Sequence, residues 1–278
     1  MAKSRKLLNR AASFTANAAI GGVKLLLKGA TTMAFGVWNI SKNVVASEIE
    51  KSKKPQLQPT YSTFNTLQTI HGDFDKFEEK ILSSKSSVGI ILGSRGSGKS
   101  ALGMRLLENA KAKGRHVQAL GFTPTSLPSW INCINSIDEV KNNSFLLVDE
   151  GGITFSSRSS MNDANKLLSQ LLLISRHKDL SVIFISQNSA NIDINAIRQA
   201  DYLLFKKSSL LQLDFERKKI KEIYLSADAG FKKFSSSLGL TFVYSDEFQG
   251  FASNELPSFW SESASKSFSK FTPKSAVK

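Results

Sequence analysis

The sequence predicts an α/β domain in which a mostly parallel sheet is covered by helices. Between about residues 61 and 250, apolar strand-like runs alternate with helix-like runs, which is the pattern of a parallel sheet flanked by helices. A glycine-rich loop at residues 93–100 also joins one of these strands to a helix. With 278 residues, 41% of them hydrophobic, the chain is long enough for one sizeable domain with extensions.

The individual elements follow from short apolar runs and from helical periodicity. Runs rich in apolar and β-branched residues predict strands at 88–92, 116–120, 144–149, 181–186, 202–206 and 241–245. Apolar residues at helical spacing predict helices at 99–113, 162–177 and 210–224. In the first of these helices the repeating residues are Leu102, Leu106 and Leu107, and Gly114 stops the pattern.

The chain divides into four predicted parts. They are a basic amphipathic helical segment (1–46), a linker (47–60), the α/β domain (61–250) and a Ser/Lys-rich tail (251–278). The linker contains Pro55 and Pro59 and mixed charge, which is typical of a connecting segment. The tail is expected to be poorly ordered unless it docks on a neighbour.

The charge balance favours a polyanionic partner. The formal net charge is +14, and residues 1–54 hold ten Lys or Arg against only two Glu. Nucleic acid and an acidic membrane surface are the partners that such an excess attracts. The single cysteine, Cys133, excludes an internal disulfide framework and suits a reducing compartment. No cleavable secretory signal is expected, because no small-residue cleavage site follows a compact apolar core near the start.

The glycine-rich loop carries the strongest motif in the chain. The spacing G-x-x-x-x-G-K-[ST] is met at every fixed position by Gly93, Ser94, Arg95, Gly96, Ser97, Gly98, Lys99 and Ser100. A strand, a glycine loop and a helix in this order wrap backbone N–H groups around a phosphate. These residues, with Ala101 after them, are therefore predicted to bind ATP. Lys99 would reach the β- and γ-phosphates, and the Ser100 hydroxyl would bind Mg²⁺.

Polar residues at the ends of two further strands complete the predicted site. The run "SFLLVDEGG" ends a strand in Asp149 and Glu150, which suits a Mg²⁺-side carboxylate followed by a general base. The run "SVIFISQN" ends another strand in polar residues, among which Gln187 is a candidate sensor of the γ-phosphate. The alternative for Asp149 and Glu150 is an acidic strand end that faces solvent. The alternative for Gln187 is an ordinary turn that follows the strand.

Three ordered blocks between about residues 85 and 210 resemble FtsK/HerA-type DNA-pumping ATPases. They are "GSRGSGKS", "LLVDEGG" and "ISRHKDLSVIFISQNSANIDINAIRQADYLLFKKSS". The chain looks closest to the compact packaging ATPases of viruses with an internal membrane and a double-jelly-roll capsid. It is also similar to the zonula-occludens-toxin-like assembly ATPases of filamentous phages. The DNA-reading domains of the larger cellular translocases are not found in this sequence.

The resemblance implies a RecA-like P-loop fold and a role for each motif residue. It implies phosphate contact by Lys99 and Ser100, a Mg²⁺ ligand in Asp149, a base in Glu150 and a sensor in Gln187. It also implies an arginine finger acting between subunits of a ring, with a hexamer favoured. Arg176 and Arg158 are the candidates, and Arg176 is included among the predicted catalytic residues.

The function predicted on this basis is ATP-driven, sequence-independent translocation of double-stranded DNA, in the form of viral genome packaging. The expected location is the virion or the host cytoplasm, with membrane association as a further possibility. The basic residues 217–221 and Lys206 or Lys207 are the expected DNA contacts. The alternatives are a membrane-bound phage assembly ATPase and a nucleotide switch that recruits a membrane partner. A GTPase is disfavoured because no N-K-x-D follows a late strand, and a small-molecule kinase because no arginine-rich lid is evident.

Residues 1–46 form a candidate interfacial helix. Lysine, arginine and small polar residues fall on one narrow stripe of a helical wheel, and the remainder is mostly apolar. The longest uncharged stretches, 11–23 and 29–41, are too short for a spanning helix, which needs about 20 residues. Contact with a membrane surface is the favoured interpretation. Packing on the α/β domain and a basic arm on DNA are the alternatives.

Overall fold

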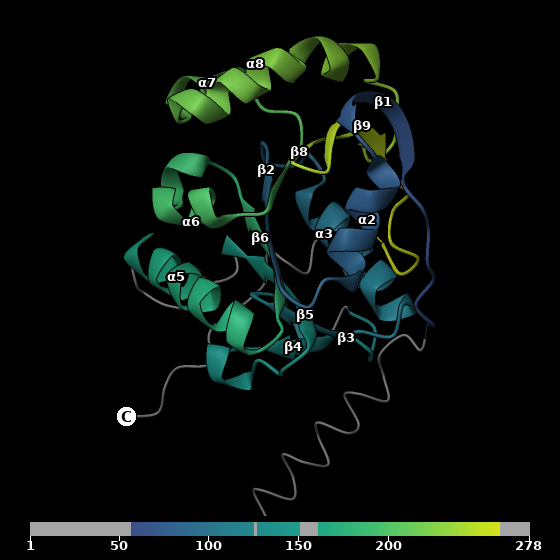
Figure 1. Ribbon diagram of the computed structural model, residues 1–278, viewed down its shortest axis with the longest axis vertical. Helices are drawn as coiled ribbons and strands as arrows, with labels where there is room; N and C mark the ends of the chain where they lie inside the picture. The colour runs from purple at the N-terminus through teal and green to yellow at the C-terminus, as the bar shows by residue number, and fades with distance from the viewer. Residues whose placement is uncertain (1–56, 125–126, 151–160, 262–278) are drawn as a thin grey trace, which may run out of the picture. The chain divides into compact units, whose positions relative to one another are not determined.

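The computed structural model describes residues 57–124, 127–150 and 161–261, all within the compact unit Lys54–Lys278. Its centre is a nine-stranded sheet with the order β1-β9-β8-β7-β2-β6-β5-β3-β4 (Figure 1). The strands are β1 (Asn65–Gly72), β2 (Ser87–Leu92), β3 (His116–Leu120), β4 (Asn132–Ile134), β5 (Ser144–Asp149), β6 (Ser181–Ser186), β7 (Tyr202–Phe205), β8 (Thr241–Ser245) and β9 (Phe248–Ser253). All six predicted strands are confirmed, and β1, β4 and β9 are additional.

Helices cover both faces of the sheet. The α-helices are α2 (Phe74–Ser83), α3 (Lys99–Ala112), α5 (Met161–His177), α6 (Ile194–Gln199), α7 (Leu210–Phe215) and α8 (Lys218–Lys233). Two short 3₁₀ turns are η2 (Ile137–Glu139) and η3 (Ser189–Asn191). Helices α2 and α3 pack into one hydrophobic core with the sheet, whereas α5, α6 and α8 pack into a second.

Successive side chains of β2 point to opposite faces of the sheet, so this strand contributes to both hydrophobic cores. The side chain of Ile91 belongs to the α2/α3 core, and those of Ile90 and Leu92 belong to the opposite core. All three are completely buried. Full burial of such a side chain contributes about 1.5–3 kcal/mol, so the strand that leads into the glycine loop is firmly fixed.

The order of the strands confirms the RecA-like P-loop fold. Strands β7, β2, β6, β5, β3 and β4 are parallel, and β8, β9 and β1 extend the sheet in the antiparallel sense. Strand β6 lies between the strand that precedes the glycine loop and the strand that ends in Asp149. The carboxyl ends of parallel strands meet at one edge of a sheet, which is where ligands bind in such folds.

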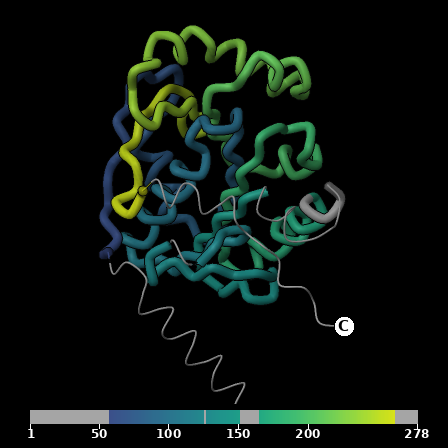
Figure 2. Tube along the Cα trace, turned by 180° about the vertical axis from the view of Figure 1, so that it is seen from behind, coloured from purple at the N-terminus to yellow at the C-terminus, as the bar shows by residue number. Residues whose placement is uncertain are grey.

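The two ends of the described chain meet on the same side of the domain. Strand β1 pairs with β9, and both views place the first described strand beside the last (Figures 1 and 2).

On α3, the buried carboxylate of Glu108 forms an ion pair of 3.0 Å with Arg105 and accepts bonds from the backbone N–H groups of Thr60 and Ser258. The predicted tail therefore overlaps β9 and a packed segment that reaches Ser261; residues 262–278 lie outside the described part.

Candidate functional site

The glycine loop forms an open backbone cradle between β2 and α3. Gly96 and Gly98 have φ angles of +76° and +90°, in the left-handed region that favours glycine. A Cβ atom built on either glycine would meet no atom of the described residues within 4 Å, so those residues leave the space beside the loop open. The buried Ser97 hydroxyl has no hydrogen-bond partner in the described residues. An orphaned donor and an uncapped helix start at α3 together fit an anion such as a phosphate.

The loop is anchored to the neighbouring strand by a single carbonyl. The backbone N–H of Ser94 donates to the carbonyl of Lys207 at 3.2 Å, and its hydroxyl donates to the same oxygen at 2.9 Å. Because Lys207 follows β7, this contact fixes the loop against the strand beside β2. Arg95, at the tip of the loop, is exposed.

Lys99 occupies the centre of the loop. Its side chain is 7% exposed, and its ammonium donates to the carbonyls of Gly93 and Ser94, each at 2.8 Å. Burial lowers the pKa of Lys99, and the nearby carboxylates of Asp149 and Glu150 oppose that shift. An ammonium kept in this desolvated position is suited to a multiply charged phosphate.

The predicted metal ligands lie within reach of each other. The Ser100 hydroxyl donates to Asp149 Oδ2 at 3.3 Å, joining the start of α3 to the end of β5. A hydroxyl and a carboxylate are the oxygen ligands that Mg²⁺ prefers, so this pair fits the ion. When bound there, Mg²⁺ would neutralise charge on the phosphate oxygens. Elsewhere in the described part of the chain, no group of three or more His, Cys, Asp or Glu residues is placed to hold a metal.

Glu150 is buried next to these residues and is held by the end of β6. The Ser186 hydroxyl donates to Glu150 Oε2, and the Asn191 side chain and the Gln187 backbone also hydrogen-bond to the carboxylate. Burial raises the pKa of Glu150, and these hydrogen bonds partly offset that rise. A carboxylate with raised proton affinity beside the metal-ligand pair is suited to accept a proton from water.

The structure places Gln187 at the same edge of the sheet. It directly follows β6, between the ends of β2 and β5, and its side chain is exposed. Its carbonyl accepts a bond of 2.6 Å from Gln212 Nε2 on α7. Sequence reasoning missed the roles of Ser186 and Asn191, because their contact with Glu150 requires knowing that β6 lies beside β5.

Arg176 lies at the opposite edge of the sheet. It is exposed in the last turn of α5. Strand β6 begins five residues later, at Ser181, which pairs with Ser87 at the start of β2. A six-residue strand spans about 17 Å, so Arg176 is far from the Lys99 of its own chain. The other candidate, Arg158, lies outside the described residues, as do the predicted membrane contacts in residues 1–46.

A cavity of about 310 Å³ adjoins the glycine loop. One wall is formed by the loop and by Ala101 and Leu102 at the start of α3. The other is formed by Phe231 of α8, the segment 235–240 and Asn254. Its volume lies at the lower end of the range for small-molecule sites. A group attached to a phosphate bound at the loop would fit in this cavity.

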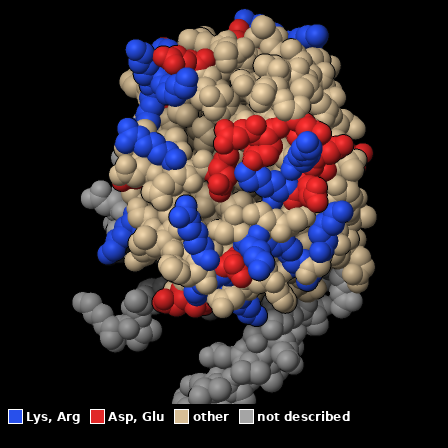
Figure 3. All heavy atoms as spheres, viewed as in Figure 1, with Lys and Arg blue, Asp and Glu red and all other residues tan. Residues whose placement is uncertain are grey.

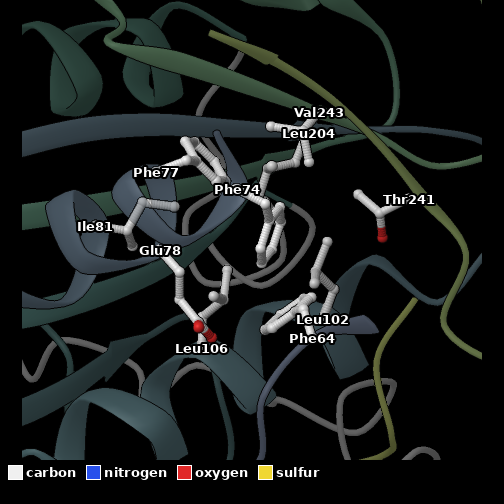
Figure 4. Close-up of a pocket in the computed structure, with 10 residues that line it drawn as sticks. All are labelled: Phe64, Phe74, Phe77, Glu78, Ile81, Leu102, Leu106, Leu204, Thr241 and Val243. Atoms are coloured by element: carbon white, nitrogen blue, oxygen red, sulfur yellow. The ribbon is translucent and has the colours of Figure 1, made fainter. Parts of the chain in front are cut away.

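A second, much smaller void has a different character. It measures about 10 Å³ and lies between α2, α3 and β7–β8, where apolar side chains surround Glu78 and Thr241 (Figure 4). Such a volume holds at most one water molecule. Among the described residues, one oxygen of Glu78 there has no hydrogen-bond partner, and burial raises the pKa of this carboxyl. This void belongs to the core rather than to the candidate site.

The surface corrects the expected DNA contacts. Lys206 is 2% exposed and its ammonium donates to the carbonyls of Gly239 and Leu240 at 2.7 and 3.1 Å, so Lys206 is wrong as a surface contact. Arg217 is also occupied, by backbone carbonyls of the turn after β6. The exposed cations of the predicted group are Lys207, Lys218 and Lys219.

Acidic residues are interleaved with this basic surface. Lys219 and Lys221 lie 3.8 and 3.5 Å from Glu222 and Asp214. Figure 3 shows basic and acidic side chains together near α7 and the start of α8, and a separate acidic gathering over α2. The face over α2 is therefore unsuited to nucleic acid, and the α7–α8 face is only moderately basic.

The buried Lys206 predicts an unusual dependence of stability on pH. Burial lowers the pKa of Lys206 to about 7 in the fold, whereas an unfolded lysine keeps about 10.4. Between these values the unfolded chain binds the proton and the folded chain does not, so stability rises with pH. We expect the free energy of unfolding to increase from pH 7 to pH 10 relative to Lys206→Met, by an amount on the order of a few kcal/mol. Chemical denaturation of both proteins across this range measures the difference; parallel curves would contradict it.

No helix in the described part of the chain is both long and apolar enough to cross a membrane. No protein-family model matches the chain, and no curated protein matches it either.

Several solved structures have a similar fold. One is the DNA-packaging ATPase B204 of Sulfolobus turreted icosahedral virus, at 14% identity, covering 61% of this chain and 98% of that one, with a TM-score of 0.42. Another is the genome packaging NTPase B204 of Sulfolobus turreted icosahedral virus 2 in complex with AMPPCP, at 15% identity, 62% and 99% coverage and a TM-score of 0.43. A third is the N-terminal domain of zonular occludens toxin from Neisseria meningitidis, at 18% identity, 43% and 76% coverage and a TM-score of 0.31.

Proposed function

We propose that this chain is an ATPase that moves double-stranded DNA, of the kind that packages viral genomes. The observation that carries the ATPase part is the convergence of Lys99, the Ser100–Asp149 pair and the buried Glu150 at one edge of the sheet. These are a phosphate-binding cation, metal ligands and a base, which together are the parts that phosphoryl transfer to water requires.

Each residue has a defined part in the proposed reaction. Lys99 and the loop N–H groups hold the β- and γ-phosphates of ATP, and Ser100 and Asp149 hold Mg²⁺. Glu150 takes a proton from the water whose oxygen attacks the γ-phosphorus. The bond from that phosphorus to the β–γ bridging oxygen breaks, and ADP leaves with the bond's electron pair. Gln187, at the end of β6, would touch the γ-phosphate or the attacking water.

The 310 Å³ cavity is the proposed place of the adenosine group. It begins at Gly96 and Gly98, where the phosphates would lie, and includes Ala101. The segment 235–240 lines one wall, and the buried Lys206 holds this segment through the carbonyls of Gly239 and Leu240. This supports ATP rather than inorganic polyphosphate as the ligand, since the site extends beyond the phosphate cradle.

Double-stranded DNA is the proposed macromolecular partner. The +14 net charge supports a polyanion, and Lys207, Lys218 and Lys219 are exposed near the edge of the sheet that carries the site. Much of the excess charge lies in residues 1–54, outside the described part, so the described face alone would bind DNA weakly. A homo-oligomeric ring, with a hexamer favoured, is proposed because Arg176 cannot serve the nucleotide of its own chain.

Stimulation of hydrolysis by DNA tests the motor. We expect duplex DNA of unrelated sequences to raise the turnover of ATP equally, because the contacts are to phosphates. The apparent affinity should fall steeply as salt rises, since each neutralised phosphate releases counterions. Hydrolysis with and without two duplexes of different sequence, at several salt concentrations, measures this. Hydrolysis that DNA leaves unchanged would favour a phage-type assembly ATPase, and binding of ATP without turnover would favour a nucleotide switch.

Residues 1–46 are proposed to contact a membrane surface, which would place the protein at a membrane in the virion or host cytoplasm. Their lysines should favour anionic lipid by about 1 kcal/mol each near the surface. Deletion of 1–46 is expected to release the protein from anionic liposomes while basal hydrolysis is retained. Flotation of the full-length and truncated chains, with hydrolysis measured on both, checks this. Loss of hydrolysis on truncation would instead support packing of the segment on the domain.

A further inference from the structure

The turn η3 connects the proposed base to the outer helices. Its residue Asn191 hydrogen-bonds through its side chain to the Glu150 carboxylate. Ser186 and the backbone of Gln187, just before the turn, supply further bonds to the same group. The orientation of Glu150 therefore depends on where the segment 186–191 is held.

Glu216 holds this turn by its N–H side. Its side chain lies between α7 and α8 and is 8% exposed. The carboxylate accepts bonds from the Ser189 backbone N–H at 3.2 Å, from the Ser189 hydroxyl, and from Gln212 Nε2 at 3.0 Å. A buried carboxylate is stable only when such donors replace water, so Glu216 and the turn are mutually fixed.

Arg217 holds the same turn by its carbonyls. Its Nε donates to the carbonyl of Ser189 at 3.0 Å, and Nη2 donates to those of Ile192 at 2.6 Å and Ala190 at 3.5 Å. Because the rigid guanidinium fork spans several carbonyls at once, it fixes the orientation of the turn as well as its position. Glu216 and Arg217 thus bond to the N–H groups and to the carbonyls, respectively, of the same segment, 189–192.

We propose that Glu216 and Arg217 are positioning residues for Glu150: they hold the η3 turn so that Asn191 stays on the base carboxylate. The proposal rests on the proposed function, in which Glu150 activates water. Neither residue touches the nucleotide site itself. A displacement of the turn would therefore slow the chemical step and leave ATP binding intact. Lys99 is held by carbonyls of the glycine loop itself, and the loop is anchored elsewhere, to the carbonyl of Lys207.

The first test compares turnover with ATP affinity. For Arg217→Ala in the full chain, we expect kcat to fall by about tenfold or more, because misplacement of a catalytic group by about 1 Å can cost 10²-fold. The Kd for ATP should stay within about twofold of wild type. Arg217→Lys should give an intermediate kcat, since an ammonium bonds fewer carbonyls than the fork does. Wild-type kcat in Arg217→Ala would overturn the proposal.

A second variant keeps the test usable if Arg217→Ala fails to fold. Within the described part of the chain, the groups that bond to the Glu216 carboxylate are all donors. Glu216→Gln keeps the size of the side chain but places an amide N–H group against one of these donors. We expect the same split, with kcat lowered and ATP affinity kept. The matched control is Glu108→Gln, a buried carboxylate on α3 that also accepts backbone bonds; its melting temperature should fall without loss of kcat.

A double-mutant cycle identifies the route. If Glu216 and Arg217, here called the clamp, act through Asn191, then adding Arg217→Ala to Asn191→Ala should reduce kcat little further, because the contact with Glu150 is already lost. Losses that multiply would overturn the proposal. The proposed function and the clamp fail in different ways. A wild-type protein without ATP hydrolysis, or a Glu150→Gln variant with unchanged turnover, would refute the proposed function. An active wild type and an inactive Glu150→Gln variant, together with clamp variants of normal turnover, would refute only the clamp.

Discussion

Replacement of Lys99 by alanine is expected to abolish ATP hydrolysis. The ammonium is the cation fixed at the centre of the glycine loop, where it is buried and bonded to two loop carbonyls. Its removal takes away a charge that stabilises the transition state, and loss of one such group costs about 10²–10³-fold in kcat. ATP affinity should fall as well, because the same ammonium binds the ground-state phosphates.

Glu150→Gln should separate turnover from binding. The amide keeps an oxygen for the Ser186 hydroxyl but cannot accept a proton from water, so hydrolysis should fall by about 10²–10⁴-fold. The Kd for ATP should remain near wild type. Isothermal titration with ATP and a phosphate-release assay on both variants provide the two numbers. Lys85→Ala, an exposed lysine at the other end of β2, is the matched control and should behave as wild type. Equal loss of ATP binding in Lys99→Ala and Glu150→Gln would contradict the assigned roles.

The nucleotide-binding part of the site was predictable because its information is local. The loop motif fixes its own geometry through glycines at left-handed positions, and apolar runs of five or six residues marked the parallel strands. Asp149 and Glu150 were also marked locally, by their place at the end of such a run. What these features share is that each is decided by residues within about ten positions of one another.

The parts that the sequence did not predict depend on distant partners. Strand β1 exposes most of its residues on both faces, so it shows neither an apolar run nor a clean alternation, and it forms only because β9 pairs with it. Strand β9 contains Gly250 and crosses the predicted boundary at residues 250–251, so its second half lies in the stretch expected to be tail. Lys206 resembles a surface lysine until the connection to β8 covers it.

The predicted helix 210–224 was wrong in a way that explains the clamp. The structure has two helices, α7 and α8, broken at Glu216 and Arg217, and the second continues to Lys233. Helical periodicity runs through the break, so the sequence alone gives no reason for it. The break arises because the side chains of both residues bond to the turn after β6, a segment more than twenty residues earlier in the chain.

A mixture of two inactive variants is expected to recover activity if Arg176 acts on a neighbouring subunit. Arg176 and Lys99 lie at opposite edges of the same sheet, so one nucleotide site can use both only when they come from different chains. An arginine finger contributes about 10³–10⁵-fold to turnover, and Arg176→Ala alone should therefore be nearly inactive, as should Lys99→Ala. In a head-to-tail ring, co-expression of the two variants restores sites that pair an intact Lys99 with an intact Arg176.

The recovered activity should reach about a quarter of wild type for equal, random mixing in a heterologous ring, measured as DNA-stimulated phosphate release by the co-purified complex. Arg198→Ala, which changes an exposed arginine on α6, is the control and should be fully active alone. Full activity of Arg176→Ala alone would remove Arg176 from the site and leave Arg158 as the sequence's other candidate. Two inactive variants that assemble together without recovery would show that Arg176 does not act across the subunit boundary. Recovery would establish that each nucleotide site is completed by its neighbour, which is the condition for turnover to pass around a ring.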